Sequence, residues 1–193
     1  MGISLMATLV AAFVLVVLLG GLWWLMPILG GLPWIPTAHA RIRKALELAQ
    51  LRPGERLYDL GAGDGRVLIL AAREFGARAI GIEFSPLHCL LAVWLARNNR
   101  LGAQVTVRRE DFFQTDLRDA DVVFAFMTSR QAPRLRTHLE SQLRPGARVV
   151  TVSFDLDGWQ PTAIDQTNLL FLYKMPPTPG NVASFLEQNN KGI

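Results

Sequence analysis

Hydrophobic and polar positions follow two different periods between residues 38 and 176 of this 193-residue chain. Short apolar runs bounded by turn residues indicate strands, and apolar residues that recur every three or four positions indicate helices. Strands are predicted at ERLYDL, ARAIGIEF, QVTVRRED, ADVVFAFM, ARVVTVSF and NLLFLYKM, and helices at ARIRKALELAQL, GRVLILAAREFG, SPLHCLLAVWLARNN and QAPRLRTHLESQL. This order predicts an α/β fold built of βαβ units, with a mostly parallel sheet that binds its ligand at the carboxyl ends of the strands.

The first forty residues differ in composition from the rest of the chain, because they are nearly all apolar and contain no Asp, Glu, Lys or Arg. The run is longer than the roughly 20 helical residues that cross a bilayer core. Indole rings, which favour the membrane interface, occur near its end at Trp23, Trp24 and Trp34. Basic residues follow at Arg41, Arg43 and Lys44. We therefore expect one N-terminal transmembrane helix, with the rest of the chain on the cytoplasmic side by the positive-inside rule.

Two alternatives compete with the anchor. Ala38-His39-Ala40 resembles the cleavage site of a signal peptide, but the segment before it lacks a basic start and is longer than a signal peptide's apolar region. A helix buried in a protein core would leave the pairs Gly20-Gly21 and Gly30-Gly31 as costly interruptions. The single membrane anchor is the interpretation that these observations favour.

Composition narrows the classes of protein further. The net charge is +4 and the isoelectric point is about 9.8, which suits an anionic membrane surface or a nucleic acid. Cys89 is the only cysteine, so the chain has no internal disulfide. With three histidines and one cysteine, we expect no metal site.

The most informative motif is YDLGAGDGRV at residues 58–67, directly after the first predicted strand of the body. A dinucleotide-binding loop would have its third glycine at position 66, which is arginine here, and a phosphate-binding P-loop would need Gly-Lys-Ser/Thr. The pattern Asp-x-Gly-x-Gly-x-Gly is instead similar to the first motif of methyltransferases that use S-adenosylmethionine. That cofactor carries an ammonium, a carboxylate and a sulfonium in place of phosphates.

Each part of the motif has an expected role toward that cofactor. Gly61, Gly63 and Gly65 allow the backbone to approach the methionyl chain, and Asp59 orders the loop or the ammonium. Glu83 at the end of the second strand can accept bonds from both ribose hydroxyls. Further on, REDFF provides two more candidates, Asp111 for the adenine amino group and Phe112 as an apolar wall.

A closer resemblance extends from about residue 32 to residue 173. PWIPT, LYDLGAGDGRVLILAA, GIEFSP, EDFFQTDLRDADVV, LRPGARVVTVSFDLDGWQP and LFLY resemble the seven-strand protein lysine methyltransferases that include an archaeal broad-specificity enzyme and the mitochondrial enzyme acting on the ATP synthase c-subunit. The resemblance implies a Rossmann-like seven-strand sheet with helices on both faces, a monomeric catalytic body, and lysine side chains of proteins as acceptors. It divides the chain into an anchor at 1–31, a Pro-rich segment with the first helix at 32–50, a methyltransferase domain at 51–176 and a C-terminal tail at 177–193.

The acceptor site is predicted less directly. By analogy with these relatives, the Pro-rich segment covers the acceptor channel, and aromatic side chains that favour methylammonium groups form its walls. The candidates are Trp34, Pro36, Thr37, Phe84, Phe113, Phe126 and Trp159. FAFMTSRQAP and TVSFD depart from the family's pattern, and no residue is identified as a general base, so the catalytic residue is left unassigned.

Three functions fit these observations. The first is a membrane-anchored lysine methyltransferase whose substrate is a protein, with membrane proteins included. The others are a methyltransferase for a lipid-soluble small molecule and a membrane module that binds the cofactor without catalysis. No nucleic acid is expected as partner, because no Asn/Asp-Pro-Pro-Tyr motif follows the fourth strand and the arginines form no long basic run.

Overall fold

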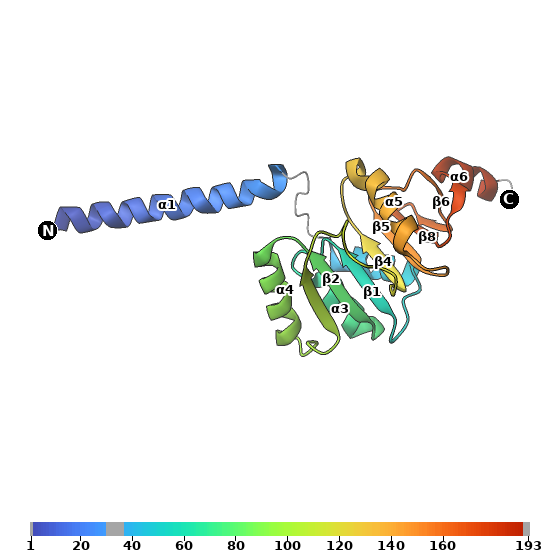
Figure 1. The fold of residues 1–193 in the computed structure, drawn as a ribbon, viewed down its shortest axis with the longest axis horizontal. Coiled ribbons are helices and arrows are strands. Elements are labelled where there is room, and N and C mark those ends of the chain that lie inside the picture. Colours follow the sequence, from blue (N-terminus) through green and yellow to red (C-terminus); the bar gives the residue numbers. More distant parts are fainter. Residues whose placement is uncertain (1, 30–36, 191–193) are drawn as a thin grey trace. The chain divides into compact units, whose positions relative to one another are not determined.

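The computed structural model describes residues 2–29 and 37–190 (Figure 1). It divides into two compact units, Met1–Ile35 and Pro36–Ile193. Of the described residues, those in the first unit form one helix, and those in the second unit form the strands and all the other helices. The boundary lies inside the Pro-rich segment, so the helix that follows this segment belongs to the catalytic body.

Helix α1 (Gly2–Leu29) continues through Gly20 and Gly21 without interruption. It contains no charged residue, and the side chains of residues 5–21 are exposed. Within the described part of the chain, no helix combines the length and the hydropathy of a membrane span. The membrane anchor at residues 1–31 therefore stays a prediction.

The body is built on a seven-stranded mixed sheet, as expected for the fold. Its strands are β1 (Arg56–Leu60), β2 (Arg78–Glu83), β3 (Val105–Arg109), β4 (Val122–Ala125), β5 (Arg148–Val152), β7 (Ala163–Asp165) and β8 (Leu170–Lys174). Their order is β3-β2-β1-β4-β5-β8-β7, with β1 to β5 parallel and β8 antiparallel to both of its neighbours. The order reverses between β1 and β4, and in such sheets the ligand binds at this reversal.

Four α-helices accompany the parallel strands: α2 (His39–Leu48), α3 (Arg66–Phe75), α4 (Pro86–Asn98) and α5 (Ala132–Gln142), the last preceded by a 3-10 turn, η1 (Ser129–Gln131). Helix α3 packs against both α2 and α4. Because parallel crossovers are right-handed and the strand order reverses at β1, α5 covers the face opposite to α3 and α4. The predicted helices on both faces are thus present.

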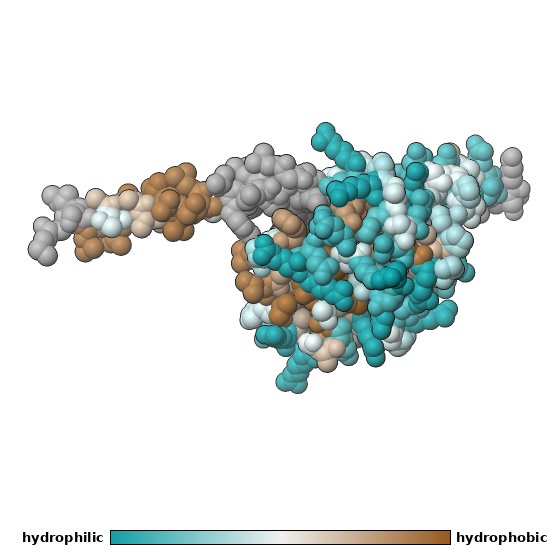
Figure 2. Space-filling model, viewed as in Figure 1, coloured by the Kyte–Doolittle hydropathy of each residue, from teal (hydrophilic) through white to brown (hydrophobic). Residues whose placement is uncertain are grey.

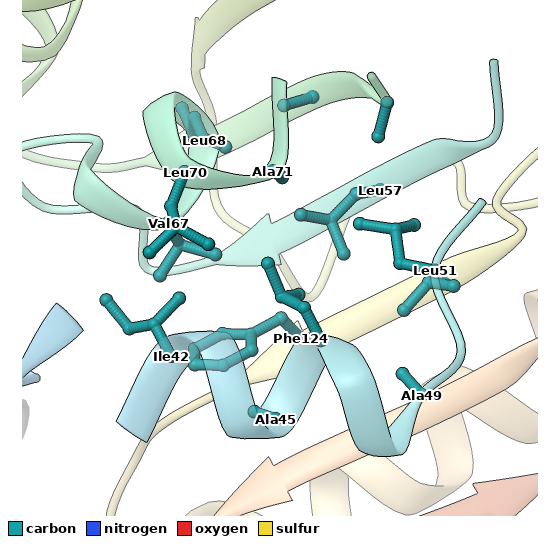
Figure 3. Packing of buried hydrophobic residues seen from close by; sticks show 14 of the residues in the cluster. Ile42, Ala45, Ala49, Leu51, Leu57, Val67, Leu68, Leu70, Ala71 and Phe124 are labelled. Atoms are coloured by element: carbon teal, nitrogen blue, oxygen red, sulfur yellow. The ribbon is translucent and has the colours of Figure 1, made fainter. Parts of the chain in front are cut away.

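The core lies between β1, β4 and the helices α2 and α3 (Figure 3). Ile42 of α2 lies beside the ring of Phe124 of β4, and Ala45 of α2 belongs to the same buried cluster. Leu57 of β1 and Val67 of α3 complete the same buried cluster. The buried positions of α2, Ile42, Ala45 and Leu46, are three and four residues apart and give the helix one buried face.

The C-terminal part contains structure that the sequence pattern did not predict. The C-terminal tail at 177–193 contains a strand, β9 (Thr178–Gly180), and a helix, α6 (Val182–Asn190). Strand β9 pairs with β6 (Gly158–Gln160) in a separate two-stranded sheet, and α6 packs on β6. Three-residue strands are too short to show a period, so only their pairing reveals them.

Candidate active site

The glycine loop leaves the carboxyl end of β1 and turns directly into α3. The amides of Gly61 and Ala62 both donate to the carbonyl of Ile82 in β2 (2.9 and 3.0 Å), and the amide of Gly65 donates to the carbonyl of Ala62 (2.8 Å). The φ angles of Gly61, Gly63 and Gly65 are 94°, 53° and 78°. Residues with side chains rarely adopt such angles, so the loop depends on glycine at these positions.

Two of these glycines have different further roles. A Cβ on Gly65 would lie 2.9 Å from the Cβ of Ala92, so this glycine allows α3 to start against α4. A Cβ on Gly61 would meet nothing within 4 Å. The backbone at Gly61 is therefore open to an approaching molecule at the carboxyl edge of the sheet, where ligands bind in this class of fold.

Glu83, the last residue of β2, connects the loop with the next helix. One carboxylate oxygen accepts from the amide of Gly63 (2.9 Å), and the other accepts from the amide of Ser85 (2.8 Å). Both oxygens keep a lone pair for a further donor. The carboxylate is thus fixed beside the glycine loop and can accept hydroxyl donors from a ligand.

Asp59 in β1 is the most buried acid of this region, with 3% of its surface exposed. Burial, followed by the nearby negative charges of Glu83 and Asp64, raises the pKa of its carboxyl from 3.8 to about 8. A buried carboxyl among other carboxylates is stabilised in its charged form by a cation. The site therefore favours a ligand with a positive group close to Asp59.

Arg66 directly follows the third glycine of the loop, and its contacts show why an arginine occupies this position. Its guanidinium pairs with the carboxylate of Asp64 (2.6 Å), and its Nη1 donates to the carbonyl of Thr37 (3.1 Å). Thr37 is buried. The pair ties the end of the Pro-rich segment to the glycine loop. Sequence analysis missed this role, although an acid and an arginine two positions apart are a possible signal for it.

Asp111 and Phe112 follow β3 at the same edge of the sheet. Asp111 accepts from the amide of Phe113 (3.0 Å), which shapes the turn, and Phe112 is buried. The rings of Phe112 and Phe113 are 4.3 Å apart. The guanidinium carbon of Arg134, in α5, lies 3.8 Å from the centre of the Phe113 ring. A cation and an aromatic pair thus lie together after β3.

A second such arrangement lies at the ends of β4 and β5. Arg41 donates to the carbonyl of Asn168 and to the hydroxyl of Ser153 (both 2.7 Å), and its guanidinium carbon is 5.9 Å from the Phe126 ring. Phe126 comes directly after Ala125, the partner of the last residue of β1. The sequence interpretation treated Arg41 only as a charge flanking a membrane helix, whereas it holds the carboxyl edge of the sheet together.

The other residues predicted for the acceptor channel do not share one environment. Phe84 is exposed, while Trp159 is buried, donates to Glu140 (2.8 Å) and packs edge-on against Tyr173. Trp34 and Pro36 lie outside the described residues. Among the described aromatic candidates, Phe113 and Phe126 each have a guanidinium over the ring at this edge of the sheet. In the described parts of the chain, no group of three or more His, Cys, Asp or Glu residues could hold a metal ion.

Comparison with known proteins is consistent with this geometry. The family model described as the ANTKMT methyltransferase domain matches residues 59–163. The chain is 33% identical to a protein-lysine N-methyltransferase of Saccharolobus islandicus over 68% of its own length and 83% of the relative. It is 34% identical to the adenine nucleotide translocase lysine N-methyltransferase of Mus musculus, over 79% of this chain and 67% of that one.

A solved structure agrees as well. The chain is similar to an RNA methyltransferase of Salinibacter ruber in complex with S-adenosyl-L-homocysteine, with 34% identity and a TM-score of 0.72. The likeness covers 76% of this chain and 97% of that protein. The glycine loop and the acids Asp59 and Glu83 at the ends of β1 and β2 lie within the matched residues 59–163. The chain belongs to the family of the ANTKMT methyltransferase domain and is a methyltransferase that uses S-adenosylmethionine.

Proposed function

We propose that the chain transfers methyl groups from S-adenosylmethionine to lysine side chains of protein substrates. The observation that carries this proposal is the identity of a third with two lysine N-methyltransferases, each over two thirds or more of the chain. The glycine motif identifies the cofactor rather than the acceptor. The wider likeness, which extends well beyond the glycine motif, supports lysine as the acceptor.

The residues at the carboxyl edge fit S-adenosylmethionine. This molecule supplies an activated methyl group on a positive sulfur. Asp59 would interact with its ammonium group, since a buried carboxyl with a raised pKa is stabilised by a cation. The open backbone at Gly61, together with Gly63 and Gly65, would lie along the methionyl chain. Glu83 would accept the ribose hydroxyls.

The remaining cofactor residues would hold the base. Asp111 would accept from the adenine amino group, and Phe112, buried behind it, would provide an apolar surface. Thr37, whose carbonyl accepts from Arg66, would lie beside the end of the glycine loop that holds the cofactor. These assignments combine the sequence motif with the positions that the fold gives to the residues.

An acceptor lysine must lose its proton before it can accept a methyl group, and its ordinary pKa is about 10.4. Phe113 and Phe126, each close to an arginine, would form the walls of its channel. Apolar walls remove water from the ammonium, and a neighbouring guanidinium repels it. Both effects lower the pKa of the lysine and favour the neutral amine.

The proposal includes attachment to a membrane, with the body on the cytoplasmic side. It is supported by the absence of charged residues before Arg41 and by the exposed apolar side chains of residues 5–21. Basic residues at the start of the body agree with this orientation. Attachment raises the effective concentration of acceptors that are themselves in or on the membrane.

The test uses the full chain in detergent with cofactor that carries a labelled methyl group. It is incubated with membranes and RNA from cells that lack the enzyme, and protein, lipid and RNA are then separated. The proposal predicts label on a protein band, with lysine identified by mass spectrometry. Glu83→Ala should abolish the label, while Glu47→Ala, which changes an exposed acid on α2, should retain it.

Other outcomes would each contradict the lysine assignment. Label in the lipid fraction alone would show a lipid-soluble acceptor. Label in RNA alone would agree with the name of the Salinibacter ruber relative. Cofactor binding without any label would show a module that does not catalyse transfer.

A further inference from the structure

Helix α4 exposes apolar side chains that a soluble surface normally excludes. We call the set Phe84, Leu87, Leu90, Leu91 and Trp94 the α4 stripe. Its members are between 39% and 74% exposed. Figure 2 shows them as a brown area over α4, at the edge of an otherwise mostly hydrophilic face of the body. An exposed apolar patch of this kind marks an interaction surface.

The spacing shows that the stripe is a second face of the helix. Leu87, Leu90, Leu91 and Trp94 follow the i, i+3, i+4, i+7 rule and share one side. The opposite side is formed by small residues, Ala92 and Ala96, which are buried against the body. Helix α4 is thus buried against the body through Ala92 and Ala96, and the large apolar residues of the stripe remain available to a partner.

The charges around the stripe indicate what kind of partner it is. From residue 84 to residue 109 the chain has four arginines and no Asp or Glu. The rest of the chain has 16 basic and 16 acidic residues (20 less four, against 16), so this segment accounts for the whole net charge of +4. Arg109 donates to the carbonyl of Phe84 (3.4 Å), which brings one of these charges to the end of the stripe. Arg97 follows Trp94 by one helical turn and is exposed.

We propose that the α4 stripe inserts into the surface of an anionic lipid bilayer, with the arginines of residues 97–109 on the lipid headgroups. Leucine and tryptophan side chains beside basic residues are typical of helices that lie in the membrane interface. Anionic lipids attract arginines without the matched acidic pattern that a protein partner would have to provide. The proposal rests on the proposed membrane attachment, because residues 1–40 would hold the body near the bilayer.

The contact would orient the active site. Phe84 directly follows Glu83, whose carboxylate is bonded to the glycine loop. The carboxyl edge of β2 would then lie beside the membrane surface, which specifies the class of substrate: lysines of membrane proteins within reach of the headgroups. A lysine far from the bilayer in a large soluble protein would be a poor acceptor.

The experiment measures the depth of α4 in the full chain. In a Cys89→Ser background, an environment-sensitive fluorophore is attached at Leu90→Cys or, as the matched control, at Ser141→Cys on the exposed side of α5. Both proteins are reconstituted into vesicles of phosphatidylcholine with or without phosphatidylglycerol, each containing lipid with a nitroxide near the acyl boundary. Flotation with the vesicles is measured first.

We expect quenching at position 90 to be about threefold stronger than at position 141 in the anionic vesicles, because inserted side chains reach 5–10 Å into the interface. Omission of phosphatidylglycerol, or high salt, should reduce the difference. If the protein floats but positions 90 and 141 are quenched equally, the α4 proposal is overturned and the anchor stands. A fluorophore at position 90 that is shielded from water but not quenched by the nitroxide lipid would indicate a protein partner, and would also overturn the α4 proposal. Failure to float would overturn both proposals.

Discussion

Replacing the buried acid at the end of β1 tests the electrostatic description of the site. Asp59→Asn keeps the shape of the side chain and removes its charge. In the folded chain the pKa of Asp59 is about 8, against an ordinary value of 3.8, chiefly because of burial. Between these two values the folded state holds a proton that the unfolded state has released. Stability without cofactor must therefore fall as pH rises through this window, and the loss is complete above about pH 8.

The size of the effect follows from the shift. Each pKa unit corresponds to about 1.4 kcal/mol, so ionising Asp59 removes about 4 kcal/mol of stability between about pH 5 and about pH 8.5. Acids with lowered pKa values, such as Asp64 beside Arg66, have the opposite sign and titrate at lower pH. The Asn variant should lose most of the pH dependence and be more stable than the original chain at about pH 8.5.

The assay is urea unfolding of the full chain in nonionic detergent at several pH values, with equal m-values as the check that only stability changes. Asp64→Asn is the control, because this change should destabilise the chain at neutral pH by removing the partner of Arg66. Calorimetry in two buffers at about pH 7 adds a second readout. Cofactor binding should release a proton from the original chain and none from Asp59→Asn. A variant less stable than the original at about pH 8.5 would refute the reasoning.

Three further changes test other parts of the site. Gly65→Ala should lower the free energy of unfolding in urea by about 2–4 kcal/mol, because the new Cβ would combine a positive φ with a 2.9 Å approach to Ala92. Gly54→Ala is the control, since its φ is also positive but its surroundings are open, and it should lower the free energy by only about 1 kcal/mol. Arg66→Gln should weaken cofactor binding in calorimetry by about tenfold, because the link to the Pro-rich segment is lost; unchanged affinity would contradict that role. Arg134→Gln should move the rise of the methylation rate to higher pH without changing cofactor affinity, since the acceptor lysine loses a repelling charge.

The fold was predicted well where the pattern is long enough to have a period. The strands from ERLYDL to NLLFLYKM and the helices between them are present, because buried strands form short apolar runs and amphipathic helices repeat apolar residues every three or four positions. The strands β6, β7 and β9 were not predicted, because each has three residues and forms only through pairing with a distant segment.

The residues of the candidate site also fall into those that the sequence located and those that only the structure located. Asp59, Glu83 and Asp111 lie at the carboxyl edge as expected, because the parallel topology brings strand ends together. The aromatic candidates could not be separated by sequence, since an aromatic residue in an apolar run looks the same whether it faces the core, solvent or a site. Phe84 is exposed, Trp159 packs on Tyr173, and Phe126 lies beside Arg41.

By itself, the amino-acid sequence determined the class of fold, the glycine loop with its acids, and an uncharged N-terminal segment, because these depend on composition and on spacing along the chain. Only the tertiary structure decided what Arg41 and Arg66 bind, which aromatic rings have a cation beside them, and that α4 turns its large apolar residues outward. Those properties depend on which distant segments meet, and in α4 on the small residues that fill the core side.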